Sequence, residues 1–139
     1  MADFKTTYRV AWADVDGAQV LHHSNYFRLF ERVEEEFYEH LVLGSGFRFF
    51  IEREIWLPRV EVFCKYKAPA RLGDMLEVSL SIEEVKEKAV RYSFTVEKKD
   101  GGVIVAEGYV VAVAADKNFE KAVIIPPEIA EKLTLFKNG

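Results

Sequence analysis

Residues 13–43 read ADVDGAQVLHHSNYFRLFERVEEEFYEHLVL, a short loop followed by one long amphipathic segment. From Asn25 to about Leu43, large apolar residues recur at steps of three and four, as along one face of an α-helix. They are Tyr26, Phe30, Val33, Phe37 and Leu41. Ser24 supplies a hydroxyl cap at the start, and Gly44 and Gly46 end the segment. A helix of roughly 20 residues, against an average of about 11–12, needs a broad sheet to cover its apolar stripe.

The sheet is predicted from alternating apolar residues. Strands are expected within residues 4–12, 59–67, 76–82, 90–96 and 103–114, with Asp100-Gly101-Gly102 as a hairpin turn. Residues 47–57 stay open between loop, helical turn and strand, and Pro126-Pro127 begins a short final helix. Glu34 and the other charges of residues 25–43 fall mostly off the apolar stripe. The pattern predicts an α+β fold in which residues 1–139 form one domain.

Composition excludes several classes of protein. The net charge of −4 argues against nucleic-acid binding, which depends on Lys and Arg meeting phosphates. No segment approaches the roughly 20 apolar residues of a membrane span, and the first residues hold no apolar run typical of a signal peptide. The single cysteine, Cys64, forms no internal disulfide and is expected to be a small core residue. These observations favour a cytoplasmic protein.

The loop before the helix concentrates chemistry-bearing side chains. Asp14, Asp16, His22 and His23 lie within ten residues of one another and lead into a helix N-terminus. Free amides in a first helical turn polarise a carbonyl oxygen, and a nearby carboxylate can activate water or attack the carbonyl itself. The alternative is an ordinary Asp-Gly turn beside packing histidines. No metal is expected, because adjacent histidines point in different directions and no metal-ligand spacing is present.

Two groups of residues resemble a known family. Asp14-Val15-Asp16, His23-Ser24-Asn25-Tyr26 and Phe30-Glu31 resemble the opening signature of the 4-hydroxybenzoyl-CoA thioesterase family. Residues 58–74, PRVEVFCKYKAPARLGD, resemble that family's second strand and the turn after it. One departure is Gln19, which stands where the family commonly has glycine. Glycine there permits a positive φ, so Gln19 leaves the loop shape open.

The resemblance implies a hot-dog fold, in which an antiparallel five-stranded sheet wraps one long central helix. It also implies that the chain hydrolyses acyl-CoA at sites between the subunits of a homodimer or homotetramer, with no cofactor. The catalytic aspartate carries over to Asp16, and the helix-start residue, whose amide polarises the thioester carbonyl, to His23. Asp14 is then structural. The expected substrate-binding residues are Ser24, Asn25, Tyr26, Trp56, Pro58, Lys86 and Lys88, the two lysines meeting the CoA phosphates.

Several alternatives stay open. Trp56 ends an aromatic run with Phe47, Phe49 and Phe50 that lines either an acyl pocket or ordinary core, and Trp12 is expected in the core. Asp16 acts as a general base or as a nucleophile. The rival functions are a non-catalytic acyl-CoA binding protein and a hot-dog hydratase or dehydratase. The position of the carboxylate before the helix, rather than on it, favours hydrolysis.

Overall fold

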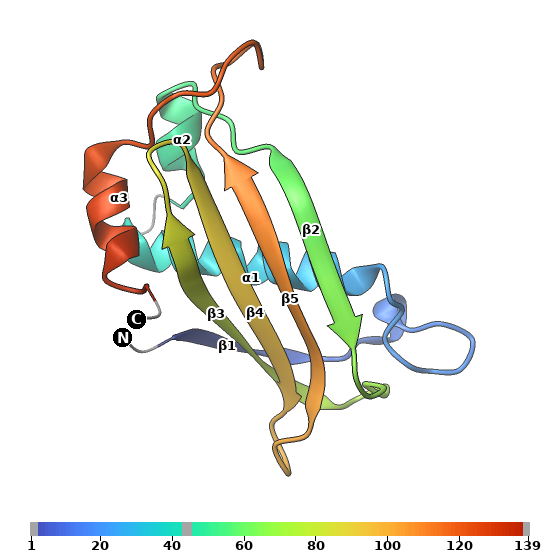
Figure 1. The fold of residues 1–139 in the computed structure, drawn as a ribbon. Helices are drawn as coiled ribbons and strands as arrows, with labels where there is room; N and C mark the ends of the chain where they lie inside the picture. Colours follow the sequence, from blue (N-terminus) through green and yellow to red (C-terminus); the bar gives the residue numbers. More distant parts are fainter. Residues whose placement is uncertain (1–2, 43–45, 138–139) are drawn as a thin grey trace.

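The computed structural model describes residues 3–42 and 46–137, and its ribbon is drawn in Figure 1. The strands are β1 (Phe4–Arg9), β2 (Arg59–Tyr66), β3 (Met75–Val85), β4 (Ala89–Lys98) and β5 (Ile104–Val113). The helices are the short 3-10 turn η1 (Trp12–Asp14), α1 (Asn25–Leu41), α2 (Arg48–Glu52) and α3 (Pro127–Thr134). The segment 47–57, open between three structures from its sequence, therefore contains a short helix.

The five strands form one antiparallel sheet in the order β1-β3-β4-β5-β2. Figure 1 shows α1 crossing one face of this sheet, with α3 beside it near the C-terminus. Gly101 and Gly102 adopt positive φ in the turn between β4 and β5, as a tight hairpin requires. The arrangement is the α+β hot-dog architecture that the sequence predicts.

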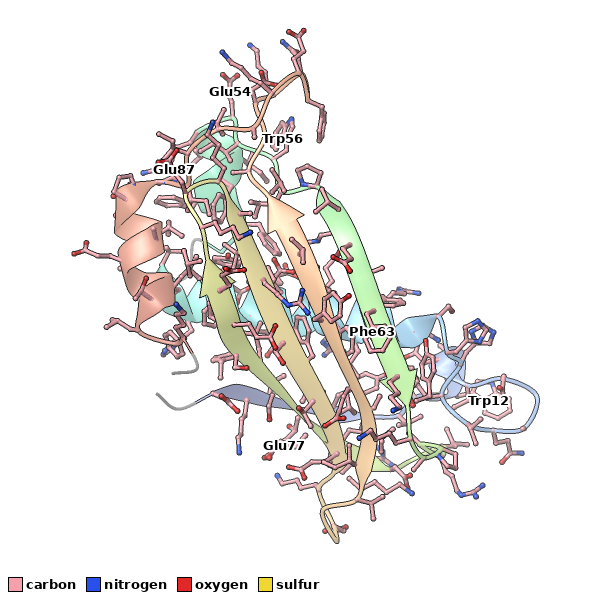
Figure 2. All side chains as sticks on the ribbon, viewed as in Figure 1. Trp12, Glu54, Trp56, Phe63, Glu77 and Glu87 are labelled. Carbon is pink, nitrogen blue, oxygen red and sulfur yellow. The ribbon has the colours of Figure 1, made fainter. Side chains whose placement is uncertain are left out.

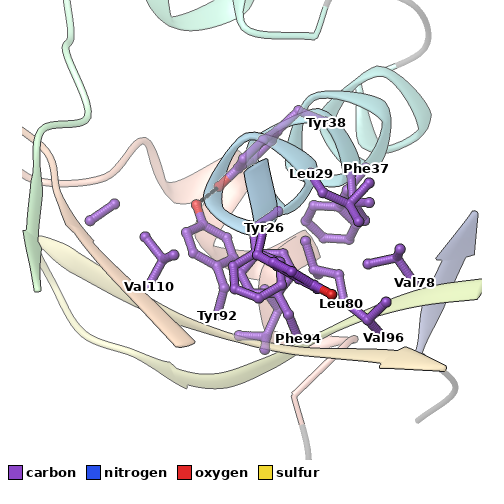
Figure 3. Packing of buried hydrophobic residues seen from close by; sticks show 14 of the residues in the cluster. Tyr26, Leu29, Phe37, Tyr38, Val78, Leu80, Tyr92, Phe94, Val96 and Val110 are labelled. Carbon is purple, nitrogen blue, oxygen red and sulfur yellow. Dashed lines mark hydrogen bonds between the residues drawn. The ribbon is translucent and has the colours of Figure 1, made fainter. Parts of the chain in front are cut away.

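The apolar stripe of α1 is buried as predicted. Tyr26, Phe30, Val33, Phe37 and Leu41 are each at most 7% exposed. Phe30 stacks on Phe94 of β4 with ring centroids 4.4 Å apart. Figure 3 shows Phe94 in the buried cluster. Gly108 of β5 makes this close approach possible, because a Cβ there would lie 2.3 Å from the Phe63 carbonyl oxygen and 2.8 Å from the Phe30 ring.

Glu34 is buried, although the sequence pattern places it off the apolar stripe of α1. It is 1% exposed, and its carboxylate accepts a 2.6 Å hydrogen bond from Arg59 at the start of β2. Glu34 Oε2 and Arg59 Nη1 are buried without a partner among the described residues. Nearby, the hydroxyls of Tyr38 and Tyr92 are hydrogen-bonded to each other, as the dashed line in Figure 3 marks. A buried charge needs a partner, and here that partner ties the central helix to an edge strand.

The ends of α1 also differ from expectation. Ser24 has helical backbone angles, and its hydroxyl makes no capping bond to the helix. It lies instead 2.8 Å from Nδ1 of His22. At the other end the helix stops at Leu41, and the Val42 amide donates to the Tyr38 carbonyl. Gly44, expected to end the helix, lies outside the described residues.

Strand β2 is less buried than its apolar content suggests. It is an edge of the sheet, and Val60, Val62, Phe63 and Tyr66 are 46–60% exposed. The pairing of β2 with β5 shifts register between Arg59 and Glu61. Cys64, expected in the core, is only half-buried. An exposed apolar edge strand is a surface that another chain can cover.

Gly108→Ala tests the close approach between α1 and the sheet. The added methyl group would overlap the Phe63 carbonyl and the Phe30 ring, so the free energy of unfolding should fall by about 1–3 kcal/mol or more. Chemical denaturation measures the change. Gly17→Ala is the control, since a Cβ at Gly17 meets nothing within 4 Å. Equal stability of both variants would contradict this packing.

Glu34 should give the protein a measurable pH dependence of stability. Burial raises the pKa of Glu34 from 4.5 to about 7, although Arg59 opposes the change. Folded Glu34 therefore keeps its proton between these pH values while the unfolded chain loses it. The free energy of unfolding then falls as pH rises through this window, by about 3 kcal/mol at most, since one pKa unit corresponds to about 1.36 kcal/mol.

The measurement is urea denaturation at pH 5 and pH 8, at one protein concentration. Glu34→Gln cannot ionise, so it should lose this part of the pH dependence. Glu35→Gln, a change at the neighbouring exposed carboxylate, should keep the wild-type difference. A Glu34→Gln variant with the full wild-type difference between the two pH values would show that Glu34 is ionised in the folded protein throughout.

Candidate active site

Asp16 lies in a tight loop closed by backbone pairing. Val15 and Leu21 form an isolated antiparallel bridge, and the Asp16 amide donates to the Val20 carbonyl at 2.9 Å. Gln19 sits at the tip with φ of 63°, the left-handed region that glycine adopts most readily. The chain thus adopts at Gln19 a positive φ, one of the conformations that glycine would allow at this position. The price is backbone strain at one position of the loop.

The Asp16 carboxylate is solvent-exposed. One of its oxygens, Oδ1, accepts a 2.8 Å hydrogen bond from the Ala18 amide. Asp16 makes no ion pair with a described residue. The loop therefore orients the carboxylate through one oxygen and leaves the other open to an incoming molecule.

The loop docks on the turn that follows β2. The Leu21 amide donates to the Ala70 carbonyl at 2.7 Å, and the Leu72 amide donates to the Gln19 carbonyl at 2.9 Å. The side chain of Asp74 closes this turn by accepting from the Arg71 amide. The two sequence segments that carry the family resemblance are therefore in direct contact.

Asp14 and Asn25 join the loop to the start of α1. The Asp14 carbonyl accepts hydrogen bonds from the His22 amide and from Asn25 Nδ2. The Asp14 carboxylate is bound by the Tyr8 hydroxyl, whose pKa rises to about 12 because of burial and this neighbouring charge. Asp14 thus has the surroundings of a structural residue. Asn25, expected to bind substrate, uses its side chain to hold the loop.

Only some of the backbone amides around His23 donate hydrogen bonds. The Asn25 amide donates to the His22 carbonyl, and the Ser24 amide donates to Nδ1 of His22 at 3.2 Å. The His23 amide makes no hydrogen bond to any described residue. Its carbonyl accepts from the Tyr66 hydroxyl at 3.1 Å. The helix start therefore presents the His23 amide, rather than that of Ser24, as the unengaged donor.

Trp56 and Pro58 line an apolar cavity of ≈ 420 Å³ at the other end of β2. Phe47, Phe50 and Ile55 contribute further apolar wall, and Glu31 of α1 and Arg59 contribute the charged groups. The indole Nε1 of Trp56 donates to the Lys117 carbonyl. Figure 2 shows Trp56 there, whereas Trp12 lies beside the Asp16 loop. Trp12 is 72% exposed, so its expected place in the core is wrong.

The structure brings together only part of the expected binding set. Tyr26 is 3% exposed and packs its ring against Tyr66, with centroids 5.1 Å apart. Lys86 and Lys88 are exposed at the turn between β3 and β4. This turn and the Asp16 loop lie at opposite ends of β3, roughly 35 Å apart for 11 residues of strand. Within one chain, these lysines do not share a site with Asp16.

The sequence provided no sign of Tyr66 as a partner of the helix start. The sequence placed Tyr66 near the end of the strand expected at 59–67, but its contact with His23 joins residues 43 positions apart.

Among the described side chains, no group of three His, Cys, Asp or Glu residues converges as metal ligands. Within residues 3–42 and 46–137, no helix is both long and apolar enough to span a membrane.

Comparisons with known proteins identify relatives that match most of the chain. A protein of Aquifex aeolicus named a putative esterase is 35% identical over 127 residues, which cover 90% of this chain and 93% of the relative. The Escherichia coli long-chain acyl-CoA thioesterase FadM is 26% identical over 82% of this chain and 86% of its own length.

Solved structures share the fold of this chain. A hypothetical protein of Aquifex aeolicus superposes with a TM-score of 0.85 at 30% identity, over 94% of this chain and 98% of that protein. A 1,4-dihydroxy-2-naphthoyl-CoA thioesterase from Synechocystis, 20% identical, shares the fold with a TM-score of 0.87 over 95% of this chain and 96% of its own. The family model for the thioesterase-like superfamily matches residues 10–133. This chain therefore belongs to the thioesterase-like superfamily.

Proposed function

We propose that this protein hydrolyses acyl-CoA thioesters to a free carboxylic acid and CoA, with Asp16 as the catalytic carboxylate. The observation that carries the proposal is the open carboxylate of Asp16 in a loop that leads to an unengaged amide at a helix start. Relatives named acyl-CoA thioesterase and acyl-CoA thioester hydrolase support the reaction class.

The Asp16 carboxylate and the His23 amide have different roles in the proposed reaction. The thioester oxygen accepts a hydrogen bond from the His23 amide, which stabilises the oxyanion that forms when the carbonyl carbon is attacked. Asp16 either removes a proton from the attacking water or attacks the carbonyl itself, and in both routes the C–S bond breaks and CoA leaves as the thiol. The partial positive charge of the α1 N-terminus adds to the stabilisation of the oxyanion.

The apolar cavity beside Trp56 and Pro58 is the proposed acyl pocket. It touches α1 at Glu31, seven residues beyond Ser24, or about 10 Å along a helix that rises 1.5 Å per residue. Its aromatic wall suits an aryl or medium-chain acyl group. The charged Glu31 and Arg59 at its border favour an acyl group with some polar character over a plain long chain.

The proposed active form is an oligomer, a homodimer or homotetramer. Asp16 and His23 do not line the apolar cavity beside Trp56 and Pro58. The exposed apolar edge of β2 ends at Tyr66, next to His23. Covering this edge with a second copy would bury Val60, Val62 and Phe63 and add a wall to the exposed site. The lysines at positions 86 and 88 would then reach the CoA phosphates from the neighbouring subunit.

The first test is release of CoA from short, medium, long and aromatic acyl-CoAs, followed with a thiol reagent. Wild type should hydrolyse at least one class, and Asp16→Asn should lower kcat by at least about a hundredfold, since general-base steps are worth about 10²–10⁴. The thermal stability of the variant should be unchanged, because Asp16 is exposed. Asp100→Asn, the same change in the exposed β4–β5 hairpin, should retain wild-type activity.

Three results would refute the proposal in different ways. Folded wild type that binds acyl-CoA without releasing CoA would identify a non-catalytic binding protein. Hydrolysis that survives Asp16→Asn would show that another group performs the reaction. Addition of water across an enoyl-CoA double bond, with no CoA released, would identify the hydratase alternative.

A further inference from the structure

Tyr66 joins the edge strand β2 to the start of the central helix. Its hydroxyl donates a 3.1 Å hydrogen bond to the His23 carbonyl. Its ring packs edge-on against Tyr26, with centroids 5.1 Å apart, and near the His23 ring at 6.4 Å. A tyrosine hydroxyl is protonated and can donate at neutral pH, since its ordinary pKa is about 10. Burial and the neighbouring Cys64 raise the pKa of Tyr66 further.

This hydrogen bond reaches a peptide group that the helix itself does not fix. The His23 carbonyl precedes the N-cap residue Ser24, and its backbone contact, from the Tyr26 amide, is long at 3.4 Å. The peptide on the other side of His23 is held by the Asn25 amide, which donates to the His22 carbonyl at 2.9 Å. Asn25 therefore restrains the His22–His23 peptide, which carries the unengaged His23 amide, and Tyr66 restrains the His23–Ser24 peptide. The two hydrogen bonds together limit rotation of the backbone about His23.

We propose that Tyr66 is a positioning residue for thioester hydrolysis, which holds the His23–Ser24 peptide and so limits the backbone rotation at His23 that would turn its amide away from the thioester oxygen. The inference rests on the proposed function, because it assigns the His23 amide to the oxyanion. A donor gives most stabilisation when it is already oriented towards the charge that develops. Loss of the Tyr66 hydroxyl should therefore weaken the transition state more than the bound substrate.

The test variant is Tyr66→Phe, which keeps the ring contacts and removes only the hydroxyl. We expect kcat to fall on the order of tenfold, the effect of losing one neutral hydrogen bond, while KM stays within about twofold. The matched control is Tyr109→Phe. Tyr109 is also a strand residue whose hydroxyl donates to an exposed partner, Glu61, and its ring stacks on Phe63 of β2. This control should retain wild-type kcat and KM.

Two non-reacting substrate analogues distinguish misorientation of the His23 amide from a general loss of substrate binding in Tyr66→Phe. In one the thioester sulfur is replaced by CF₂, so that the ketone adds water and mimics the tetrahedral transition state; in the other the carbonyl is replaced by CH₂ and the sulfur is kept. Tyr66→Phe should weaken binding of the ketone analogue severalfold and leave binding of the thioether analogue unchanged. Equal effects on both analogues, or a wild-type kcat in Tyr66→Phe, would overturn the proposal.

The analogue experiment also separates this inference from the proposed function. If wild type releases no CoA, hydrolysis fails as the activity, whereas the difference between the two analogues still reports on the His23 amide. If wild type hydrolyses acyl-CoA and Asp16→Asn abolishes it while Tyr66→Phe behaves as wild type in both assays, the reaction stands and the role of Tyr66 fails.

Discussion

Burial of the α1 stripe against one face of the sheet is the constraint on which the candidate site depends. Phe30 stacks on Phe94, and Gly108 lets the helix and the sheet approach more closely than a side chain would allow. A close-packed interior of this kind leaves a helix little freedom to shift. The first turn of α1 is thereby fixed relative to the end of β2. An amide and a carboxylate can serve a reaction only if their separation is held in this way.

The site itself is assembled mainly from backbone hydrogen bonds. The Asp16 loop pairs with itself through Val15 and Leu21, and it docks through Leu21 and Leu72 on the turn after β2. Because these contacts use main-chain groups, the side chains at the loop tip have room to vary. Gln19 illustrates this, since it adopts the left-handed conformation that glycine adopts without strain.

Strand β2 connects the parts of the molecule that matter for function. Its first residue, Arg59, binds the buried Glu34 and borders the apolar cavity, and its last residue, Tyr66, binds the start of α1. A buried ion pair contributes little net stability, because desolvation offsets the attraction, but removing one partner is costly. The Glu34–Arg59 pair therefore fixes where β2 lies on α1 more than it stabilises the fold. An exposed apolar edge lies between these two anchors.

The sequence by itself determined the local elements: the helix stripe, the alternating strands, the hairpin at Gly101 and the acidic loop before α1. Each depends on residues a few positions apart, and the hydrophobic period records such spacing directly. Only the tertiary structure decided that Glu34 is buried, that Ser24 contacts His22 instead of capping the helix, and that Tyr66 reaches His23. Glu34 and Tyr66 find partners 25 and 43 residues away. Such pairs form because strands cross the helix at a particular place, and that crossing leaves no periodic trace in the sequence.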